Sequence, residues 1–291
     1  MEVKIKTLIR NVFSLNEDDE IELNRFNIGM SNYSYLFKVN NEKYVVRVQG
    51  QDTYKFVNYY QELNSISAAN NLNLTNELIY FDVNSGTKIS KYIEGSHFEF
   101  FKSKFNVNTL VERLKQFHNI KNDSLLDYQL IERLNLYESY NLKEDLNNKY
   151  FEIKNWWIEL YNKNYINRLK VFCHNDLQTV NIISNNNNIY FLDLEYAAYN
   201  DIYYDFACFE DNAYFVLEKY FNRKIKKEEI FDIKFYQIYQ SLQWYNVALY
   251  KDKIGFSKTF NYNFLELASY FINNAYRLYK ILREVVASEI K

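Results

Sequence analysis

Residues 171–211 read VFCHNDLQTVNIISNNNNIYFLDLEYAAYNDIYYDFACFED, and the rest of the chain is best interpreted outward from them. The stretch contains a His-x-Asp pair, His174 and Asp176, and Asn181 follows the aspartate after four intervening residues. A second aspartate, Asp193, ends the hydrophobic segment Ile-Tyr-Phe-Leu. A His-x-Asp pair alone is common by chance. The same pair followed at these spacings by an asparagine and a strand-ending aspartate is not.

These residue types suit the chemistry of phosphoryl transfer. Asp176 can accept a proton from an attacking hydroxyl group, and Asn181 and Asp193 can hold magnesium on the phosphates of a nucleotide. Magnesium favours oxygen ligands and keeps several of its waters, so an amide oxygen, a carboxylate and phosphates form a sufficient set. A hairpin predicted over 180–193 would bring Asn181 and Asp193 to one edge of a sheet.

Upstream of this stretch the sequence indicates β-structure. Apolar residues alternate over 33–39 and return over 44–48, which is typical of two half-buried strands joined by a turn at 40–42. The loop at 29–34 comes where a nucleotide-covering loop is expected. It has one glycine and not the GxGxxG pattern, so an ordinary hairpin turn is the simpler interpretation.

Arg47 is the conspicuous cation of this region. It lies on an otherwise apolar strand, so its guanidinium must reach solvent, a partner carboxylate or a phosphate. A helix predicted over 54–70 carries Glu62. A pair between Arg47 and Glu62 would correspond to the Lys–Glu pair that positions phosphates in protein kinases. The competing interpretation is an ordinary surface glutamate.

The chain changes character after a second predicted hairpin, over 77–93. That hairpin ends at Tyr92 and Ile93, where the backbone of a hinge can hydrogen-bond an adenine ring. Helical spacing marks the N-terminus and dominates from about residue 105, and it predicts helices over 2–15, 105–118, 130–168, 212–222, 228–250 and 264–290. The predicted fold class is α+β, with a β-rich nucleotide-binding lobe at 1–93 and a mainly helical lobe at 94–291.

Composition limits the class of protein. The chain has 291 residues, 48% hydrophobic and 25% charged, and its net charge of −2 with no basic block argues against a nucleic-acid partner. No apolar run reaches the roughly 18 residues of a membrane span, and the N-terminus is too charged for a signal peptide. The two cysteines form no CxxC pair, which argues against a zinc site or a disulfide framework. We expect a cytoplasmic protein without membrane insertion, and the oligomeric state is not predicted.

The motifs together resemble a known family. The run 174–181 has the form H-x-D-x4-N, and Leu-Asp-Leu-Glu-Tyr-Ala at 192–197 resembles a metal-binding segment I-D-W/F-E-Y-A. The continuation at 200–207 is similar to N-D-x3-D-L-A, and Tyr-Val-Val-Arg-Val-Gln-Gly at 44–50 is similar to Y-V-L-R-I-P-G. These patterns resemble the protein-kinase-like fold of aminoglycoside phosphotransferases and choline/ethanolamine kinases, and among these the bacterial choline kinases most. The resemblance covers about residues 20 to 285.

The resemblance implies a two-lobed kinase-like fold that uses ATP and Mg²⁺. It implies that Asp176 is the catalytic base and that Asn181 and Asp193 are the magnesium ligands. The residues implied to contact the nucleotide are Ser31, Asn32, Arg47, Glu62, Tyr92 and Ile93. His174 has a structural role in such catalytic loops, and Asp205 is expected to brace the loop by hydrogen bonding.

Recognition of choline requires aromatic faces and carboxylates, because a quaternary ammonium cannot donate hydrogen bonds. The residues expected to provide them are Glu195, Tyr196, Tyr199, Asp201, Trp244 and Tyr245. The high tyrosine content, 29 residues, is a competing explanation for each of the tyrosines. Leu194 stands where many family members have Trp or Phe, which bears on choline specificity.

The resulting hypothesis is ATP- and Mg²⁺-dependent phosphorylation of a small cationic alcohol, with choline converted to phosphocholine. The alternatives are a phosphotransferase for ethanolamine, thiamine or an aminoglycoside, and a catalytically idle binding protein. An aminoglycoside site would need several carboxylates, and the predicted helix at 264–290 is not conspicuously acidic. Loss of a magnesium ligand would support an idle binding protein, and none of the expected ligands is lost.

Overall fold

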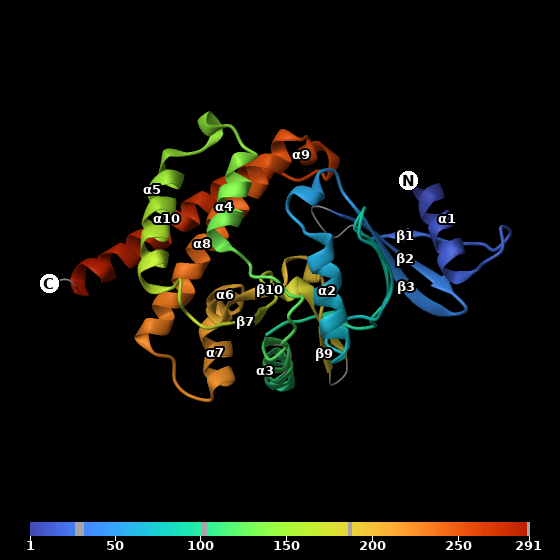
Figure 1. Cartoon of the computed structure of the whole chain (residues 1–291), viewed down its shortest axis with the longest axis horizontal. Coiled ribbons are helices and arrows are strands. Elements are labelled where there is room, and N and C mark those ends of the chain that lie inside the picture. Colours follow the sequence, from blue (N-terminus) through green and yellow to red (C-terminus); the bar gives the residue numbers. More distant parts are fainter. Residues whose placement is uncertain (27–31, 101–103, 186–187, 290–291) are drawn as a thin grey trace. The chain divides into compact units, whose positions relative to one another are not determined.

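The computed structural model of the chain describes residues 1–26, 32–100, 104–185 and 188–289 (Figure 1). The chain divides into two compact units, and the first combines residues 1–126 with residues 178–197. The second unit consists of residues 127–177 and 198–291.

The first unit contains an antiparallel sheet with the strand order β1-β2-β3-β5-β4. Asn40 and Asn41, both at positive φ (50° and 64°), join the second strand to the third in a two-residue turn whose twist suits a β-hairpin. The predicted alternation over 33–39 is confirmed. The strands are β1 (Asn24–Arg25), β2 (Asn32–Val39), β3 (Glu42–Gln49), β4 (Leu78–Asp82) and β5 (Thr87–Lys91).

Helix α1 (Glu2–Phe13) packs against one face of this sheet (Figure 1). Ile5 and Ile9 lie four residues apart, so both side chains point to the same side of the helix. They are buried with apolar side chains of the sheet, among them Phe37 and Ile89. The apolar spacing of the first helix and the alternation of the strands thus produce one hydrophobic core.

A hairpin formed by β8 (Ile182–Asn185) and β9 (Asn188–Phe191) also belongs to the first unit. Phe191 donates its backbone N–H to the carbonyl oxygen of Leu74 over 2.8 Å, which ties the hairpin to the chain that precedes β4. The remaining elements of this unit are η1 (Thr53–Lys55), α2 (Tyr59–Asn70), β6 (Ser96–His97), α3 (Lys104–His118), η3 (Thr179–Asn181) and η4 (Leu194–Tyr196).

The second unit is mainly helical, and its long helix α8 (Lys227–Lys253) lies against several other helices of that unit. An antiparallel pair of strands, β7 (Lys170–Cys173) and β10 (Ala198–Asp201), completes it. The other helices are α4 (Leu130–Ser139), η2 (Lys143–Asp145), α5 (Asn148–Asn164), α6 (Ile202–Ala207), η5 (Glu210–Asn212), α7 (Ala213–Phe221), α9 (Phe256–Thr259) and α10 (Phe264–Glu289).

Aromatic side chains fill the interior of the second unit. Trp157 stacks on Phe235 with ring centroids 4.7 Å apart, and its indole N–H donates to the carbonyl oxygen of Phe235 over 2.9 Å. Tyr204, Tyr236 and Tyr239 are fully buried in the same unit. Stacked and edge-on rings contribute packing energy beyond their buried area, so much of the aromatic excess has a structural use.

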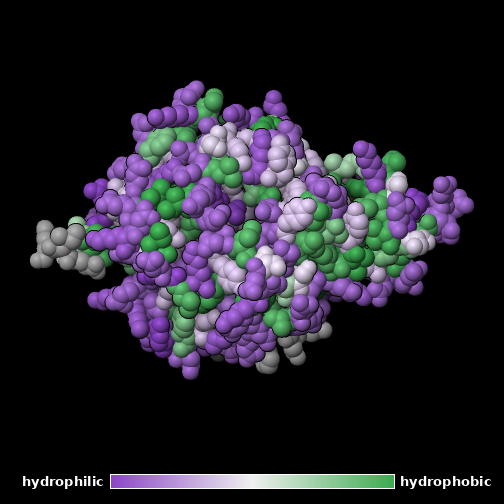
Figure 2. All heavy atoms as spheres, viewed as in Figure 1, coloured by the Kyte–Doolittle hydropathy of each residue, from purple (hydrophilic) through white to green (hydrophobic). Residues whose placement is uncertain are grey.

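Hydrophilic residues cover most of the face shown in Figure 2, and hydrophobic residues occur there in small areas. Among the helices of the described residues, none is both long enough and apolar enough to cross a membrane.

The structure confirms the predicted α+β class and corrects several element limits. The helices expected over 130–168 are α4 and α5, and they are separated at residues 140–147. The helix expected over 54–70 begins at Tyr59, where Asn58 caps it by accepting the backbone N–H of Gln61. The lobe boundary at residues 93 and 94 stays a prediction, because the compact units follow tertiary contacts that return residues 178–197 to the first unit.

We expect Ile9→Ala to lower the free energy of unfolding of the first unit by about 2–5 kcal/mol, because it leaves a cavity under α1. Val3→Ala on the same helix is the control, since Val3 is 78% exposed and a surface change costs under about 0.5 kcal/mol. Urea unfolding followed by circular dichroism compares the midpoints. Equal midpoints for the two variants would contradict the packing of α1 on the sheet.

Candidate active site

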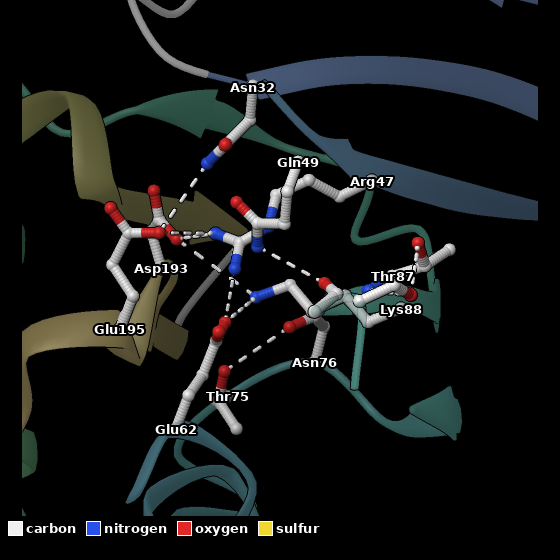
Figure 3. A network of polar contacts seen from close by, with 12 residues as sticks. Asn32, Arg47, Gln49, Glu62, Thr75, Asn76, Thr87, Lys88, Asp193 and Glu195 are labelled. Carbon is white, nitrogen blue, oxygen red and sulfur yellow. Dashed lines mark hydrogen bonds and ion pairs between the residues drawn. The ribbon is translucent and has the colours of Figure 1, made fainter. Parts of the chain in front are cut away.

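The first unit contains a cluster of charged side chains centred on Arg47 of β3 (Figure 3). The guanidinium is buried and forms ion pairs with Glu62 of α2 and with Asp193, two residues after β9. Its Nη1 also lies 3.2 Å from Oε2 of Glu195 in η4. The predicted pair between Arg47 and Glu62 is therefore present, and two further carboxylates join it.

Lys88 is a second cation of this cluster, and the sequence analysis missed it. The register of β3 against β5 places Lys88 directly opposite Arg47. Its Nζ lies 2.8 Å from Oε1 of Glu62 and 4.0 Å from Oδ1 of Asp193. Lys88 is identified by the pairing of β3 with β5, and the sequence of either strand alone does not give the register of that pairing.

Helix α2 is fixed to the segment that carries the other carboxylates. The side chains of Gln61 and Ser65 both donate to the backbone carbonyl oxygen of Ala197, over 2.9 and 3.1 Å. Oε1 of Gln61 also accepts the backbone N–H of Leu126 over 3.0 Å. Both donors are buried, so these bonds hold Glu62 in place next to the turn that follows β9.

The β8–β9 hairpin brings the two predicted magnesium ligands together. The backbone carbonyl oxygen of Asn181 accepts the backbone N–H of Leu192 over 2.7 Å. Asn181 and Asp193 therefore lie at the same end of the hairpin. Asp193 has left-handed backbone angles (φ 60°, ψ 60°), which are uncommon for a residue other than glycine. Its side chain is 35% exposed, unlike the buried Glu62.

The electrostatics of the cluster follow from its burial. Burial by itself would lower the pKa of Arg47, but the charges of Asp193, Glu62 and Glu195 raise it, so the guanidinium stays charged. Burial, together with the charge of Asp193, raises the pKa of Glu195 to about 8, against the opposing effect of Arg47. Oε2 of Glu62 and Nε of Arg47 are buried and have no hydrogen-bond partner within the described part of the chain.

An oxygen-binding cation fits these residues. Oxygens of Glu62, Asp193 and Glu195 lie within 4.8 Å of one another, and carboxylates are ligands that Mg²⁺ prefers. Oε2 of Glu62 has no hydrogen-bond partner within the described part of the chain, and a cation could supply one. Because Arg47 already pairs with Asp193, a cation bound by Asp193 would have to replace that contact.

The other predicted nucleotide-binding residues are only partly placed by the structure. Asn32 begins β2, and its side chain accepts the Gly50 N–H and donates to Glu195, each over 3.4 Å. Ser31 lies outside the described residues. The backbone N–H of Tyr92 donates to the backbone carbonyl oxygen of Lys43 over 2.9 Å, so this N–H already has a partner within the sheet.

In the second unit, side chains hold the backbone around Asp176. Asp205 accepts the backbone N–H groups of His174 and Asn175, each over 2.8 Å, and these are the contacts that a brace would make. Asn175 adopts a positive φ of 62°, and its side chain accepts a hydrogen bond from Asn200 over 2.8 Å. The sequence analysis assigned no role to Asn175 or Asn200, although both stand inside the quoted motifs.

The residues predicted to bind the substrate have mixed surroundings. Glu195 lies in the Arg47 cluster. Asp201 caps α6 by accepting the backbone N–H of Tyr203, and burial raises its pKa. The hydroxyl group of Tyr245 accepts the backbone N–H of Asn147 over 2.9 Å.

The remaining predicted positions are aromatic. Tyr196 is buried in the first unit, whereas Tyr199 and Trp244 are half-buried in the second. Leu194, which replaces a common aromatic residue, is 1% exposed and is therefore a core residue of the first unit. The aromatic cage stays a prediction.

The fold and the charged cluster define a small-molecule phosphotransferase of kinase-like architecture. The chain belongs to the choline/ethanolamine kinase family, whose sequence profile, Choline/ethanolamine kinase, matches residues 23–239. Membership of this kinase family implies that ATP is the phosphoryl donor.

Individual relatives agree with this assignment. The chain is similar to Protein LicA of Haemophilus influenzae, with 26% identity over 257 residues that cover 78% of this chain and 73% of LicA. The crystal structure of choline kinase LicA from Streptococcus pneumoniae has a TM-score of 0.74 and 22% identity, and the match covers 93% and 99% of the two chains. The aminoglycoside phosphotransferase APH(2")-IIa has a TM-score of 0.66 and 18% identity, with 96% and 98% covered. These likenesses confirm the predicted kinase-like fold.

Ser65→Ala and Ser67→Ala form a matched pair that tests the attachment of α2. Both changes gain the same helix propensity, but Ser67 is exposed and bonds only within its own helix, to Leu63. We expect Ser65→Ala to be less stable than Ser67→Ala by about 0.5–1.5 kcal/mol, the value of one buried hydrogen bond. Urea unfolding measures the difference, and two identical midpoints would contradict the bond to Ala197.

The raised pKa of Glu195 predicts a dependence of stability on pH. Between the ordinary value of 4.5 and the folded value of about 8, the folded chain keeps a proton that the unfolded chain has released. The free energy of unfolding therefore falls as pH rises through this range. We expect Glu195→Gln to flatten that fall in urea unfolding experiments, whereas the exposed control Glu22→Gln keeps the wild-type slope.

Proposed function

We propose that the protein transfers the γ-phosphoryl group of ATP to the hydroxyl group of choline, giving phosphocholine and ADP. The observation that carries the kinase chemistry is the buried Arg47 held between Glu62 and Asp193. Choline as the acceptor is supported by the similarity to LicA, since the Streptococcus pneumoniae protein is described as a choline kinase.

The nucleotide is proposed to bind along the sheet of the first unit. Arg47 would offer its guanidinium to the phosphates, because a planar, permanently charged donor suits phosphate oxygens. Ser31 and Asn32 are proposed to approach the terminal phosphate. The adenine would use the backbone of Ile93 and the carbonyl oxygen of Tyr92, because the N–H of Tyr92 is bonded to Lys43. A LicA structure in complex with AMP supports nucleotide binding by this fold.

Asn181 and Asp193 are proposed to hold Mg²⁺, with Glu195 as a further carboxylate beside Asp193. When bound, Mg²⁺ neutralises charge on the phosphate oxygens, which is the main catalytic need of phosphoryl transfer. Asp193 would then contact the metal in place of Arg47, and Glu62 would keep Arg47 in position. Glu62 can do so because hydrogen bonds from α2 to the carbonyl oxygen of Ala197 hold its helix.

Asp176 is proposed to accept the proton of the substrate hydroxyl as that oxygen attacks the γ-phosphorus atom. A base in this role must be held within hydrogen-bond reach of the hydroxyl group. The two backbone bonds from His174 and Asn175 to Asp205 restrict the loop that carries Asp176. His174 is fully buried, so it serves the loop and not the proton transfer.

The ammonium group of choline is proposed to lie among aromatic faces, drawn from Tyr196, Tyr199, Trp244 and the ring of Tyr245. Asp201 is a weaker candidate for charge pairing, because Arg168 lies 3.4 Å from its carboxylate. Ethanolamine is the nearest alternative acceptor, because the family includes kinases for both alcohols. Thiamine and aminoglycosides are more distant alternatives.

ADP release from the purified protein with ATP and Mg²⁺ tests this proposal, with choline, ethanolamine, thiamine and an aminoglycoside as acceptors. We expect turnover with choline, and we expect Asp176→Ala to lower kcat by about 10²–10⁴-fold, the usual contribution of a general base. Asp123→Ala, at an exposed position, is the control and keeps the wild-type rate.

Turnover with another acceptor alone would overturn choline and keep the chemistry. Wild-type rates in Asp176→Ala would overturn the role of Asp176. Binding of ATP without turnover of any acceptor would favour the idle binding protein.

A further inference from the structure

We propose that Lys88 is a second phosphate-binding cation of the nucleotide site, acting beside Arg47. This inference rests on the proposed kinase function and adds to it a residue to which the sequence analysis assigned no role. The chemical class of its ligand is the phosphate chain of a nucleoside di- or triphosphate.

The position of Lys88 follows from the sheet. β3 and β5 are neighbouring antiparallel strands, and Lys88 is the register partner of Arg47. Directly opposed residues of an antiparallel pair project from the same face, so both cations reach the same side of the sheet. Figure 3 shows Arg47 and Lys88 extending toward Glu62 from β3 and β5.

Lys88 shares its counter-charges with Arg47. Arg47 and Lys88 both bind the same oxygen of Glu62, Oε1, so one carboxylate faces two cations. Asp193 provides the second negative charge, in an ion pair with Arg47 and at 4.0 Å from Lys88. Glu195 lies 3.2 Å from Arg47, so three carboxylates surround the two cations before any ligand binds.

Metal binding would disturb this balance. Asp193 is the proposed magnesium ligand, and a carboxylate shared with a divalent cation no longer balances its former partner. A divalent cation would add two positive charges to Arg47 and Lys88, and Glu62, Asp193 and Glu195 could not balance all of them. Positive charge would then be in excess at a largely buried position, since the side chain of Lys88 is only 12% exposed. Buried charge requires a counter-charge, and the phosphates of the nucleotide are the anions that the reaction brings.

The chemistry of lysine suits this role. An ammonium group offers three donors on a flexible stem and binds phosphate as a point charge, whereas the guanidinium of Arg47 has a fixed fork of donors. Lys88 can therefore follow the phosphates as they move while Glu62 retains Arg47.

Lys91 is a matched control on the same strand. It stands three residues after Lys88 and therefore projects from the opposite face of β5. It also has a glutamate partner, Glu42, at 2.7 Å, but its side chain is 43% exposed. The two lysines share strand, residue type and ion pairing, and they differ in the face they occupy.

Calorimetric titration of the full chain with ADP and, separately, with adenosine tests the inference, each in EDTA and in Mg²⁺. We expect Lys88→Met to weaken ADP binding by about tenfold or more, because it loses a charged hydrogen bond to phosphate. Adenosine binding should stay unchanged, because adenosine has no phosphate. Lys88→Arg should keep most of the ADP affinity, and Lys91→Met should match the wild type. Thermal melting confirms that each variant is folded.

Each result has one meaning. An unchanged ADP affinity in folded Lys88→Met would overturn the inference and leave the kinase proposal intact. Equal losses for ADP and adenosine would also overturn it, since Lys88 would then only shape the site. A wild-type protein that binds neither ATP nor ADP would overturn the proposed function itself.

Discussion

A guanidinium buried beneath a β-sheet must be surrounded by carboxylates, and this requirement organises the first unit. The partners of Arg47 come from α2, from the residue that follows the β8–β9 hairpin and from η4. Asp193 and Glu195 lie more than a hundred residues after Arg47 and α2 in sequence, so the ion pairs can form only when the unit is completely folded. An unpartnered charge at this depth would cost several kcal/mol, which makes the cluster a condition of the fold as well as a candidate site.

Much of this arrangement could be predicted from the sequence. Arg47 on an apolar strand already required an anionic partner, and Glu62 was the correct choice. The spacing of Asn181 and Asp193 predicted a hairpin with both residues at one end, and the hydrogen bond from Leu192 to Asn181 is consistent with it. These inferences succeeded because local periodicity and the cost of burying charge act within single elements.

The failures share a different cause. Lys88 was missed because its importance comes from strand register. The contact of Glu195 with Arg47 was missed because a motif position carries no information about the direction of a side chain. The break at residues 140–147 between the helices expected over 130–168 was not located, since tertiary packing decides where a helical pattern is interrupted. Register, side-chain direction and packing of the second unit are long-range properties that no window of sequence contains.

The attachment of α2 has a consequence for how the protein can change during evolution. Gln61 and Ser65 recognise a backbone carbonyl, and every amino acid supplies that group at position 197. A mutation that replaces Ala197 cannot remove the carbonyl acceptor. Only the surrounding packing limits the size of the side chain at this position. The constraint on sequence is therefore one-sided. The two donor side chains on α2 must be kept, whereas the backbone supplies the acceptor whatever residue stands at position 197.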